Sequence, residues 1–204
     1  MVETNDRILP VGIQSFEEIR KQGCLYVDKT DIIWQLANKG KTYNYLIRPR
    51  RFGKSVLVDT LESYFLGKKE LFEGLKIMQL ETEWVKRPVI RLDMSCAGAE
   101  PETLRSYLDN AFRQYEKEYS LTPNPTDSLA DRFNAIIVGS YEQTGHQVAI
   151  LIDEYDSPLQ HSWKTPHHEA CTSIYREVFA VLKSQDKYEK FVFITGITKF
   201  TQIS

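Results

Sequence analysis

A glycine, a lysine and a serine follow one another at Gly53-Lys54-Ser55, and their side chains suit the chemistry of a bound triphosphate. Glycine lets the backbone approach phosphate oxygens without a Cβ atom in the way. The Lys54 ammonium would neutralise the terminal phosphates, and the Ser55 hydroxyl would be a ligand of Mg²⁺. A helix that opens at Ser55 would also direct free N–H groups toward the anion. The run therefore predicts a site for a nucleoside triphosphate with Mg²⁺.

The tripeptide is only the second half of the phosphate-loop pattern GxxxxGK[ST]. Arg48 stands where the first glycine belongs, and Pro49 follows it, so the front of the loop is stiffer and more basic. At average residue usage a G-K-[ST] tripeptide occurs by chance in roughly one chain in ten of this length. The competing interpretation is a glycine turn with a surface lysine, and a second motif is needed to decide between them.

The second motif is the run VAILIDEYD, in which Asp153 and Glu154 follow an unbroken apolar stretch. Such a stretch is typical of a strand buried on both faces. Asp153 would hold the magnesium shell, directly or through water, and Glu154 would orient or deprotonate the attacking water. Asp156 is expected to be a turn residue. The alternative for the whole run is a solvated acidic turn.

A third polar position follows the apolar run FVFIT near the end of the chain. Thr195 ends this run, and its side chain could lie beside the γ-phosphate. Lys199 follows soon after and could reach a phosphate. A plain glycine turn at Gly196 is the alternative interpretation.

Four strands and the helices between them must position these residues. The predicted strands, Tyr43–Ile47, Val89–Met94, Val148–Asp153 and Phe191–Thr195, alternate with helices, which implies a parallel sheet with right-handed crossovers. Ligands bind outside the carboxyl ends of such strands, so Lys54 and the acidic run would share one edge. The expected helices cover 16–21, 31–38 with Thr30 as N-cap, 55–66, 101–119, a segment from a cap at Asn124 or Thr126 to about Ser140, and a segment from Thr165-Pro166 to about Ser184.

The composition is that of an ordinary globular protein, with 204 residues, 42% hydrophobic and 12% aromatic. The net charge of −2 gives no general support for binding to nucleic acid or to an anionic membrane. Three scattered cysteines favour reduced thiols and a cytoplasmic protein. The polar N-terminus is not a signal peptide, and no apolar run approaches the ~20 residues of a membrane span.

Five segments between Leu9 and Phe200 resemble, in their order and sequence, the AAA-ATPase-like proteins of bacteria. The resemblance implies an α/β fold, a three-layer P-loop NTPase core with a parallel sheet. In that core the sensor strand, which would end at Thr195, lies between the other two strands of the site. The Arg48-Pro49 departure is itself typical of this family. The segments are LPVGIQSFEEIR, YVDKT, LIRPRRFGKSVLVDTLESYF, VAILIDEYDSP and FITGITKF.

The same resemblance assigns roles to individual residues of an ATP site. Residues 53–55 look like Walker A, Asp153 and Glu154 like Walker B, and Thr195 like the sensor. The YVDKT segment (Tyr26, Asp28, Lys29) would lie near the base or ribose, although by sequence alone it is a strand end and cap. The expected catalytic residues are Glu154, Lys54 and Thr195, the Mg²⁺ ligands are Ser55 and Asp153, and the nucleotide-binding residues are Arg50, Arg51, Phe52, Gly53, Lys54, Ser55 and Val56.

Fuller members of the family continue with another strand and often with a PD-(D/E)XK nuclease-like domain. We therefore expect an N-terminal lead-in at 1–40 and an ATPase core at 41–204 that belongs to a larger bacterial protein. This chain would lack the fifth strand, so the edge beside the Walker A strand would stay unpaired and could support a homo-oligomer. The predicted function is ATP hydrolysis, and the alternative is a nucleotide-dependent switch or scaffold without turnover for a nuclease-like domain.

Three other kinds of site compete with the nucleotide site: a metal nuclease, a separate role for the basic cluster, and a zinc site. A metal nuclease could use the carboxylates at 153, 154 and 156, but adjacent strand residues point to opposite faces. The basic cluster at 48–54 suits phosphate, with at least one of Arg50 and Arg51 as a clamp. It could also be an intersubunit finger or a nucleic-acid contact. His161, His167, His168 and Cys171 match no standard zinc spacing and are expected to be ordinary residues.

Overall fold

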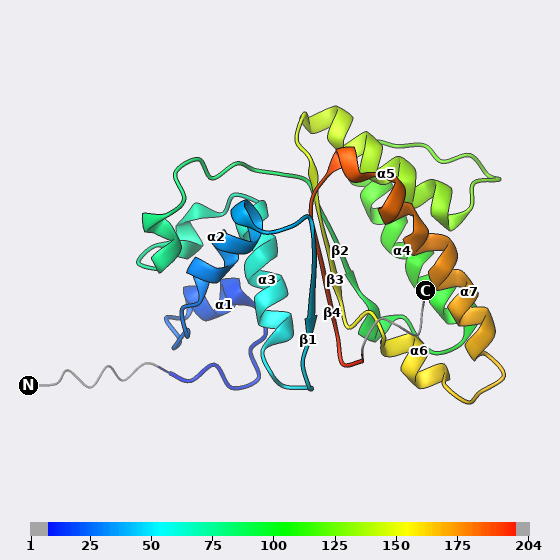
Figure 1. Ribbon diagram of the computed structural model, residues 1–204, viewed down its shortest axis with the longest axis horizontal. Coiled ribbons are helices and arrows are strands. Elements are labelled where there is room, and N and C mark those ends of the chain that lie inside the picture. The colour runs from blue at the N-terminus through cyan, green and yellow to red at the C-terminus, as the bar shows by residue number, and fades with distance from the viewer. Residues whose placement is uncertain (1–7, 199–204) are drawn as a thin grey trace, which may run out of the picture.

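A computed structural model describes residues 8–198 and shows four parallel strands between two layers of helices (Figure 1). The strand order is β1-β4-β3-β2. This is a three-layer α/β architecture consistent with a P-loop NTPase core, and it confirms the predicted fold class. The last strand in the sequence lies between β1 and β3, as expected. The strands are β1 (Tyr43–Ile47), β2 (Val89–Asp93), β3 (Val148–Asp153) and β4 (Glu189–Gly196).

One face of the sheet is covered by α1 (Phe16–Lys21), α2 (Thr30–Lys39) and α3 (Lys54–Phe65) (Figure 1). Buried side chains of α3, such as Leu61, pack against Leu151 and other residues of the central strands. Each fully buried large apolar side chain stabilises the fold by roughly 1.5–3 kcal/mol. Two short 3₁₀ turns, Lys69–Phe72 and Lys76–Gln79, complete this layer.

The other face is covered by α4 (Pro101–Glu118), α5 (Leu129–Thr144) and α7 (His168–Phe179) (Figure 1). Ile150 and Ile152 of β3 point into this second core. Because both faces of the sheet are covered, every residue of β3 is buried, which explains its unbroken apolar sequence.

Asp59 on α3 joins three elements of the first layer. Its Oδ2 accepts a hydrogen bond of 2.6 Å from the main-chain N–H of Phe16, the first residue of α1. Its Oδ1 forms a 2.7 Å ion pair with the Arg91 guanidinium of β2. The Arg91 guanidinium also contacts Glu62, one turn further along α3. Asp59 therefore connects α3 to both α1 and the edge strand β2.

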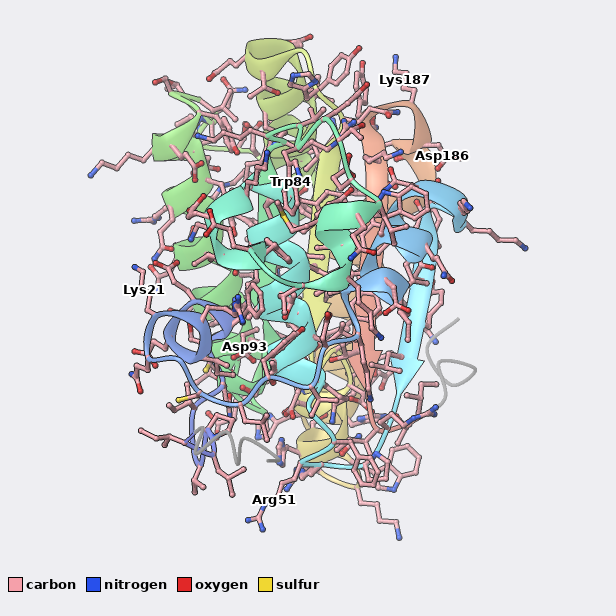
Figure 2. All side chains as sticks on the ribbon, turned by 90° about the vertical axis from the view of Figure 1, so that its left-hand side faces the viewer. Lys21, Arg51, Trp84, Asp93, Asp186 and Lys187 are labelled. Carbon is pink, nitrogen blue, oxygen red and sulfur yellow. The ribbon has the colours of Figure 1, made fainter. Side chains whose placement is uncertain are left out.

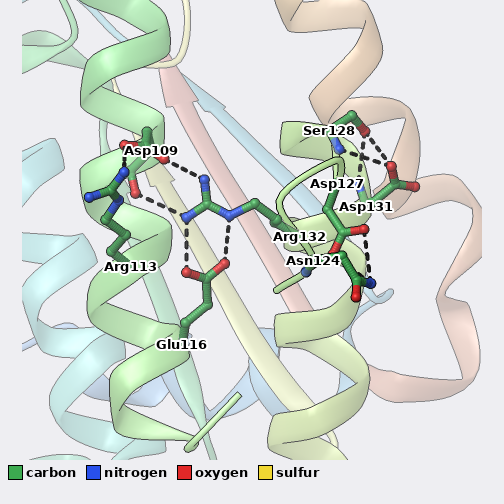
Figure 3. A network of polar contacts seen from close by, with 8 residues as sticks. All are labelled: Asp109, Arg113, Glu116, Asn124, Asp127, Ser128, Asp131 and Arg132. Carbon is green, nitrogen blue, oxygen red and sulfur yellow. Dashed lines mark hydrogen bonds and ion pairs between the residues drawn. The ribbon is translucent and has the colours of Figure 1, made fainter. Parts of the chain in front are cut away.

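A buried arginine joins α4 to α5 in the second layer (Figure 3). Arg132 binds the Glu116 carboxylate through two hydrogen bonds of 2.6 and 2.9 Å, and it also contacts Asp109. The Asp109 carboxylate has a pKa below its usual value, chiefly because Arg132 donates to it. Arg113 lies 3.0 Å from the same carboxylate. Two oppositely charged groups are thus paired where neither could be buried alone.

The start of α5 corrects one prediction. The sequence suggested a cap at Asn124 or Thr126, but the N-cap is Ser128, whose hydroxyl accepts from Asp131 N at 3.1 Å. The Asp131 carboxylate accepts from Ser128 N in return, which completes a capping box (Figure 3). Asn124 instead donates its N–H to Asp127 in the preceding turn. The reciprocal pair satisfies two end groups, and this outweighs a single Asn or Thr cap.

Other boundaries also differ. The sequence predicted no helix at Ser157–Ser162, where α6 forms directly after the acidic run. The helix expected to start at Thr165-Pro166 begins at His168 and ends at Phe179, followed by a 3₁₀ turn at Ala180–Ser184. The helix α2 begins at Thr30 rather than after it, with Lys29 as its N-cap, and the Asp28 carboxylate accepts from the Thr30 N–H at 2.9 Å.

Candidate nucleotide site

The loop from β1 to α3 turns sharply at two left-handed residues. Gly53 has φ of +72°, which glycine adopts without steric cost. Arg51 has φ of +64°, which is unusual for a residue with a Cβ atom. The helix α3 starts immediately afterwards at Lys54, so its unpaired N–H groups face the loop. This strand–loop–helix geometry suits an anion at the helix N-terminus.

The Lys54 side chain is held inside this loop and is only 4% exposed. Its Nζ donates to the main-chain oxygens of Arg48 and Pro49, at 3.2 Å each. The ammonium therefore lies against the concave side of the loop that it closes. Carbonyl oxygens are weaker partners for a cation than ionised phosphate oxygens. A phosphate that enters the loop would therefore compete well for this ammonium.

The rim of the loop is exposed and basic. Arg50 and Arg51 are exposed, and neither takes part in an ion pair among residues 8–198. Figure 2 shows Arg51 projecting from the end of the molecule where the loop lies. The Phe52 ring is 67% exposed. Ser55 and Val56 are half-buried in the first turn of α3.

The acidic motif lies at the same edge of the sheet. Ile152 of β3 pairs with Ile194 of β4, so the next residues, Asp153 and Thr195, are also neighbours. The Thr195 hydroxyl donates a short hydrogen bond to Asp153 Oδ1. Asp153 is 2% exposed and Thr195 is completely buried. The two polar side chains thus satisfy each other at the carboxyl ends of the central strands.

Asp153 also lies on the same face of the sheet as α3. Side chains alternate along a strand, so Asp153 shares a face with Leu151 and Ala149. Both of these pack in the core under α3. The structure therefore brings the helix that begins at Lys54 and the carboxylate at Asp153 to one edge and one face of the sheet.

Glu154 has a backbone conformation that needs support. Its φ is +48°, and the left-handed region costs a residue with a Cβ atom roughly 1–2 kcal/mol. Its N–H donates both to Asp153 Oδ1 at 3.1 Å and to Thr195 Oγ1 at 3.0 Å. These bonds hold the backbone in the turn. Strain of this kind clusters at functional sites.

Asp156 is buried and connects two turns of the site. Its Oδ2 accepts hydrogen bonds from the main-chain N–H groups of Ile197 at 2.9 Å and Thr198 at 2.6 Å. A Cβ atom on Gly196 would lie 2.9 Å from Asp156 Oδ1, so a larger residue there would displace the Asp156 carboxylate. The turn after β3 is thereby fixed to the turn after β4. Lys199 lies outside the described residues.

The YVDKT segment contacts α3 and the 3₁₀ turn at 76–79. The Tyr26 hydroxyl lies 3.4 Å from Thr60 Oγ1, and burial raises the pKa of this phenol. The Asp28 carboxylate accepts from the N–H groups of Thr30 and Lys76. Asp28 therefore has a structural role that joins the start of α2 to the 3₁₀ turn at 76–79, and a contact of this segment with a base stays a prediction.

Two of the histidines that match no zinc spacing have side-chain partners elsewhere. His161 Nδ1 lies 3.3 Å from Ser157 Oγ, and His168 Nδ1 lies 3.1 Å from Ser162 Oγ. The Cys171 thiol donates to the main-chain oxygen of Ala99. In residues 8–198, no group of three or more His, Cys, Asp or Glu side chains is arranged to hold a metal ion.

Sequence reasoning missed Asp93, which ends β2. It pairs in register with Asp153 on the neighbouring strand. The only indication in the sequence is that the predicted strand from Val89 also carries an acid near its end. Nothing in the sequence showed that β2 would pair with β3 in this register.

Comparison with known proteins identifies the family of the chain. The sequence profile of the AAA-ATPase-like family, described as "Predicted AAA-ATPase", matches residues 10–204. The chain belongs to this family. Membership confirms the resemblance found in the sequence and places this AAA-ATPase-like chain among proteins for which ATP use is the general expectation. No solved structure matches the chain.

One relative of this AAA-ATPase-like chain is the "Uncharacterized protein in vnfD 5'region" of Azotobacter chroococcum mcd 1. The two are 33% identical over 202 residues. The match covers 96% of this chain but only 38% of the relative, which is therefore much longer. None of the helices in the described part of the chain is long and apolar enough to cross a membrane.

Proposed function

We propose that this chain binds ATP with Mg²⁺ at the carboxyl edge of its sheet and hydrolyses it. The main support is that Lys54, at the start of α3, and Asp153, at the end of β3, lie on the same edge and the same face. A triphosphate seated on the N-terminus of α3 would extend from the cation toward the carboxylates. Phosphoryl transfer needs little more from a protein than positioning and charge stabilisation.

The residues present fit a magnesium–nucleotide complex. Mg²⁺ is commonly bound through one or two carboxylates together with phosphate oxygens and waters, so a protein need not supply a complete cage. Ser55 and Asp153 are the proposed protein ligands, directly or through water. Bound Mg²⁺ would neutralise charge on the β- and γ-phosphates.

The remaining residues have distinct proposed roles. Lys54 exchanges its carbonyl partners for phosphate oxygens, and at least one of Arg50 and Arg51 adds a second cation from the rim. Glu154 accepts the proton of the attacking water or orients it. Thr195 holds Asp153 and the Glu154 backbone in place, beside the proposed position of the γ-phosphate.

Calorimetric titration with ATP and Mg²⁺ tests this function. We expect the wild type to bind and Lys54→Ala to bind at least tenfold more weakly, since one charged phosphate contact is lost. Lys39→Ala is the matched control, because Lys39 is an exposed lysine at the far end of α2 and should leave binding unchanged. Equal and negligible binding by the wild type and Lys54→Ala would refute the proposal.

A second proposal is that nucleotide binding acts as a switch without turnover. The longer relative favours it, because most of that protein lies outside the matched region and could be the part that responds. A nuclease-like domain, as the family resemblance implies, and a homo-oligomer formed at the β1 edge are further proposals about the whole protein. Phosphate release by this chain alone would exclude the switch.

A further inference from the structure

Asp93 extends the polar row of the site by one strand. It pairs with Asp153 across β2 and β3, and paired residues on parallel strands point to the same face. Arg91, two residues earlier on β2, is ion-paired with Asp59 of α3, which independently fixes this face as the one under α3. Thr195, Asp153 and Asp93 thus stand side by side at the carboxyl ends of three adjacent strands.

Neither carboxylate of this neighbouring pair is neutralised by an ion pair among the described side chains. None of the ion pairs there involves Asp93 or Asp153. Like charges on directly paired strand positions are destabilising. The fold tolerates this repulsion at the very edge where Lys54 begins α3.

One oxygen of Asp93 is used within its own turn and the other is not. Oδ1 accepts from Ser95 N at 3.0 Å and from Ser95 Oγ at 2.6 Å. Oδ2 makes no hydrogen bond or ion pair among the described residues, and the side chain is half-buried. This arrangement fixes the orientation of the carboxylate and leaves one oxygen for a water molecule.

We propose that Asp93 is a positioning residue of the magnesium–nucleotide site, where it holds a water of the metal shell beside Asp153. This inference rests on the proposed function. Carboxylates that hold the shell of a metal through water tune its affinity and geometry, and their loss commonly costs 10–100-fold in metal affinity or activity. Asp93 also supplies a second negative charge that a divalent cation would neutralise.

The variant Asp93→Asn separates this role from a structural one. Its amide oxygen can still accept both bonds from Ser95, but the charge is removed. We expect the Mg²⁺ concentration for half-maximal effect on ATP binding and turnover to rise about tenfold. ATP binding without Mg²⁺ should stay unchanged, and the melting temperature in metal-free buffer should rise because the repulsion with Asp153 is gone.

Ser95→Ala is the matched control. It removes the side-chain hydrogen bond to Asp93 Oδ1 but keeps the bond from Ser95 N and the charge, so it should lower the melting temperature and change the Mg²⁺ dependence far less than Asp93→Asn does. An Asp93→Asn protein with the wild-type Mg²⁺ dependence would overturn the inference whatever its melting temperature, while ATP binding lost in Lys54→Ala would still support the proposed function. A wild type that binds no ATP would overturn both.

Discussion

The Thr195 hydroxyl and the Asp153 carboxylate are directly hydrogen-bonded across β4 and β3, although they lie 42 residues apart in the sequence. Both side chains are buried at the end of their strands. The Glu154 N–H donates to an oxygen of each, so Asp153, Glu154 and Thr195 belong to one hydrogen-bond network. The position of Glu154 depends on Thr195 as much as on its own neighbour in the sequence.

This network predicts different outcomes for two substitutions at Thr195. Thr195→Val keeps the shape but leaves a buried carboxylate oxygen and the Glu154 N–H with fewer partners, which costs about 1–3 kcal/mol of unfolding free energy. Thr195→Ser keeps the hydroxyl and should cost less than 1 kcal/mol. Urea unfolding measures both, and ATP turnover should be lost in the valine variant alone. Equal stability of the two variants would show that the hydrogen bond is unimportant.

The strained backbone of Glu154 predicts a trade between stability and activity. Glu154→Gly relieves the left-handed conformation and should raise the free energy of unfolding by about 0.5–1 kcal/mol, while removing the proposed base. Glu154→Gln keeps the strain and should keep ATP binding while turnover falls at least 100-fold.

Urea unfolding and phosphate release test these two variants together. If Glu154→Gln hydrolyses ATP at the wild-type rate, Glu154 has no part in the chemistry. If Glu154→Gly is less stable than the wild type, the strain is absent in solution.

Glu189 predicts a pH dependence far from the candidate site. Burial raises the pKa of this carboxyl to about 7. Its Oε2 lies 2.6 Å from the Tyr43 hydroxyl, which also contacts the main-chain oxygen of Leu182. A single hydroxyl hydrogen cannot serve both acceptors. These two contacts are both satisfied when Glu189 carries the proton and donates it to Tyr43, which then donates to Leu182.

The sign of the effect follows from this raised pKa. The folded protein keeps a proton that the unfolded chain loses above about pH 4.5, so stability is fully present below that pH. It falls as pH rises from about 4.5 through about 7, by roughly 3 kcal/mol. Glu189→Gln should abolish this part of the pH dependence in urea unfolding between pH 5 and 8. An unchanged slope in that variant would assign it to another group.

Much of the fold could be predicted because the strands are defined by local sequence. The run Val148–Asp153 is apolar throughout, and that pattern specifies a central strand whatever the helices do. The family resemblance then supplied the strand order, and the order placed the ends of β1, β4 and β3 together. The shared edge of the Lys54 loop and the acidic run followed from that order.

Two kinds of feature could not be predicted. One depends on pairing between distant segments, and the other on competition between nearby capping residues. The neighbourhood of Asp93 and Asp153 is a consequence of register, which no local pattern of β2 specifies. The start of α5 depended on competition among several good capping residues between Asn124 and Ser128, and the reciprocal pair won. The left-handed turn at Glu154 is imposed by Thr195 from another strand.

The two halves of the candidate site follow strands with different numbers of neighbours: the phosphate loop follows β1, and the acidic run follows β3. Within the described sheet β3 is flanked by a strand on each side, whereas β1 pairs with β4 alone. Amide protons of β3 should therefore exchange with solvent far more slowly than those of β1. Asp153 and Glu154 therefore follow a central strand, whereas the loop proposed to bind the anion follows an edge strand. The loop should open locally more often than the acidic turn does.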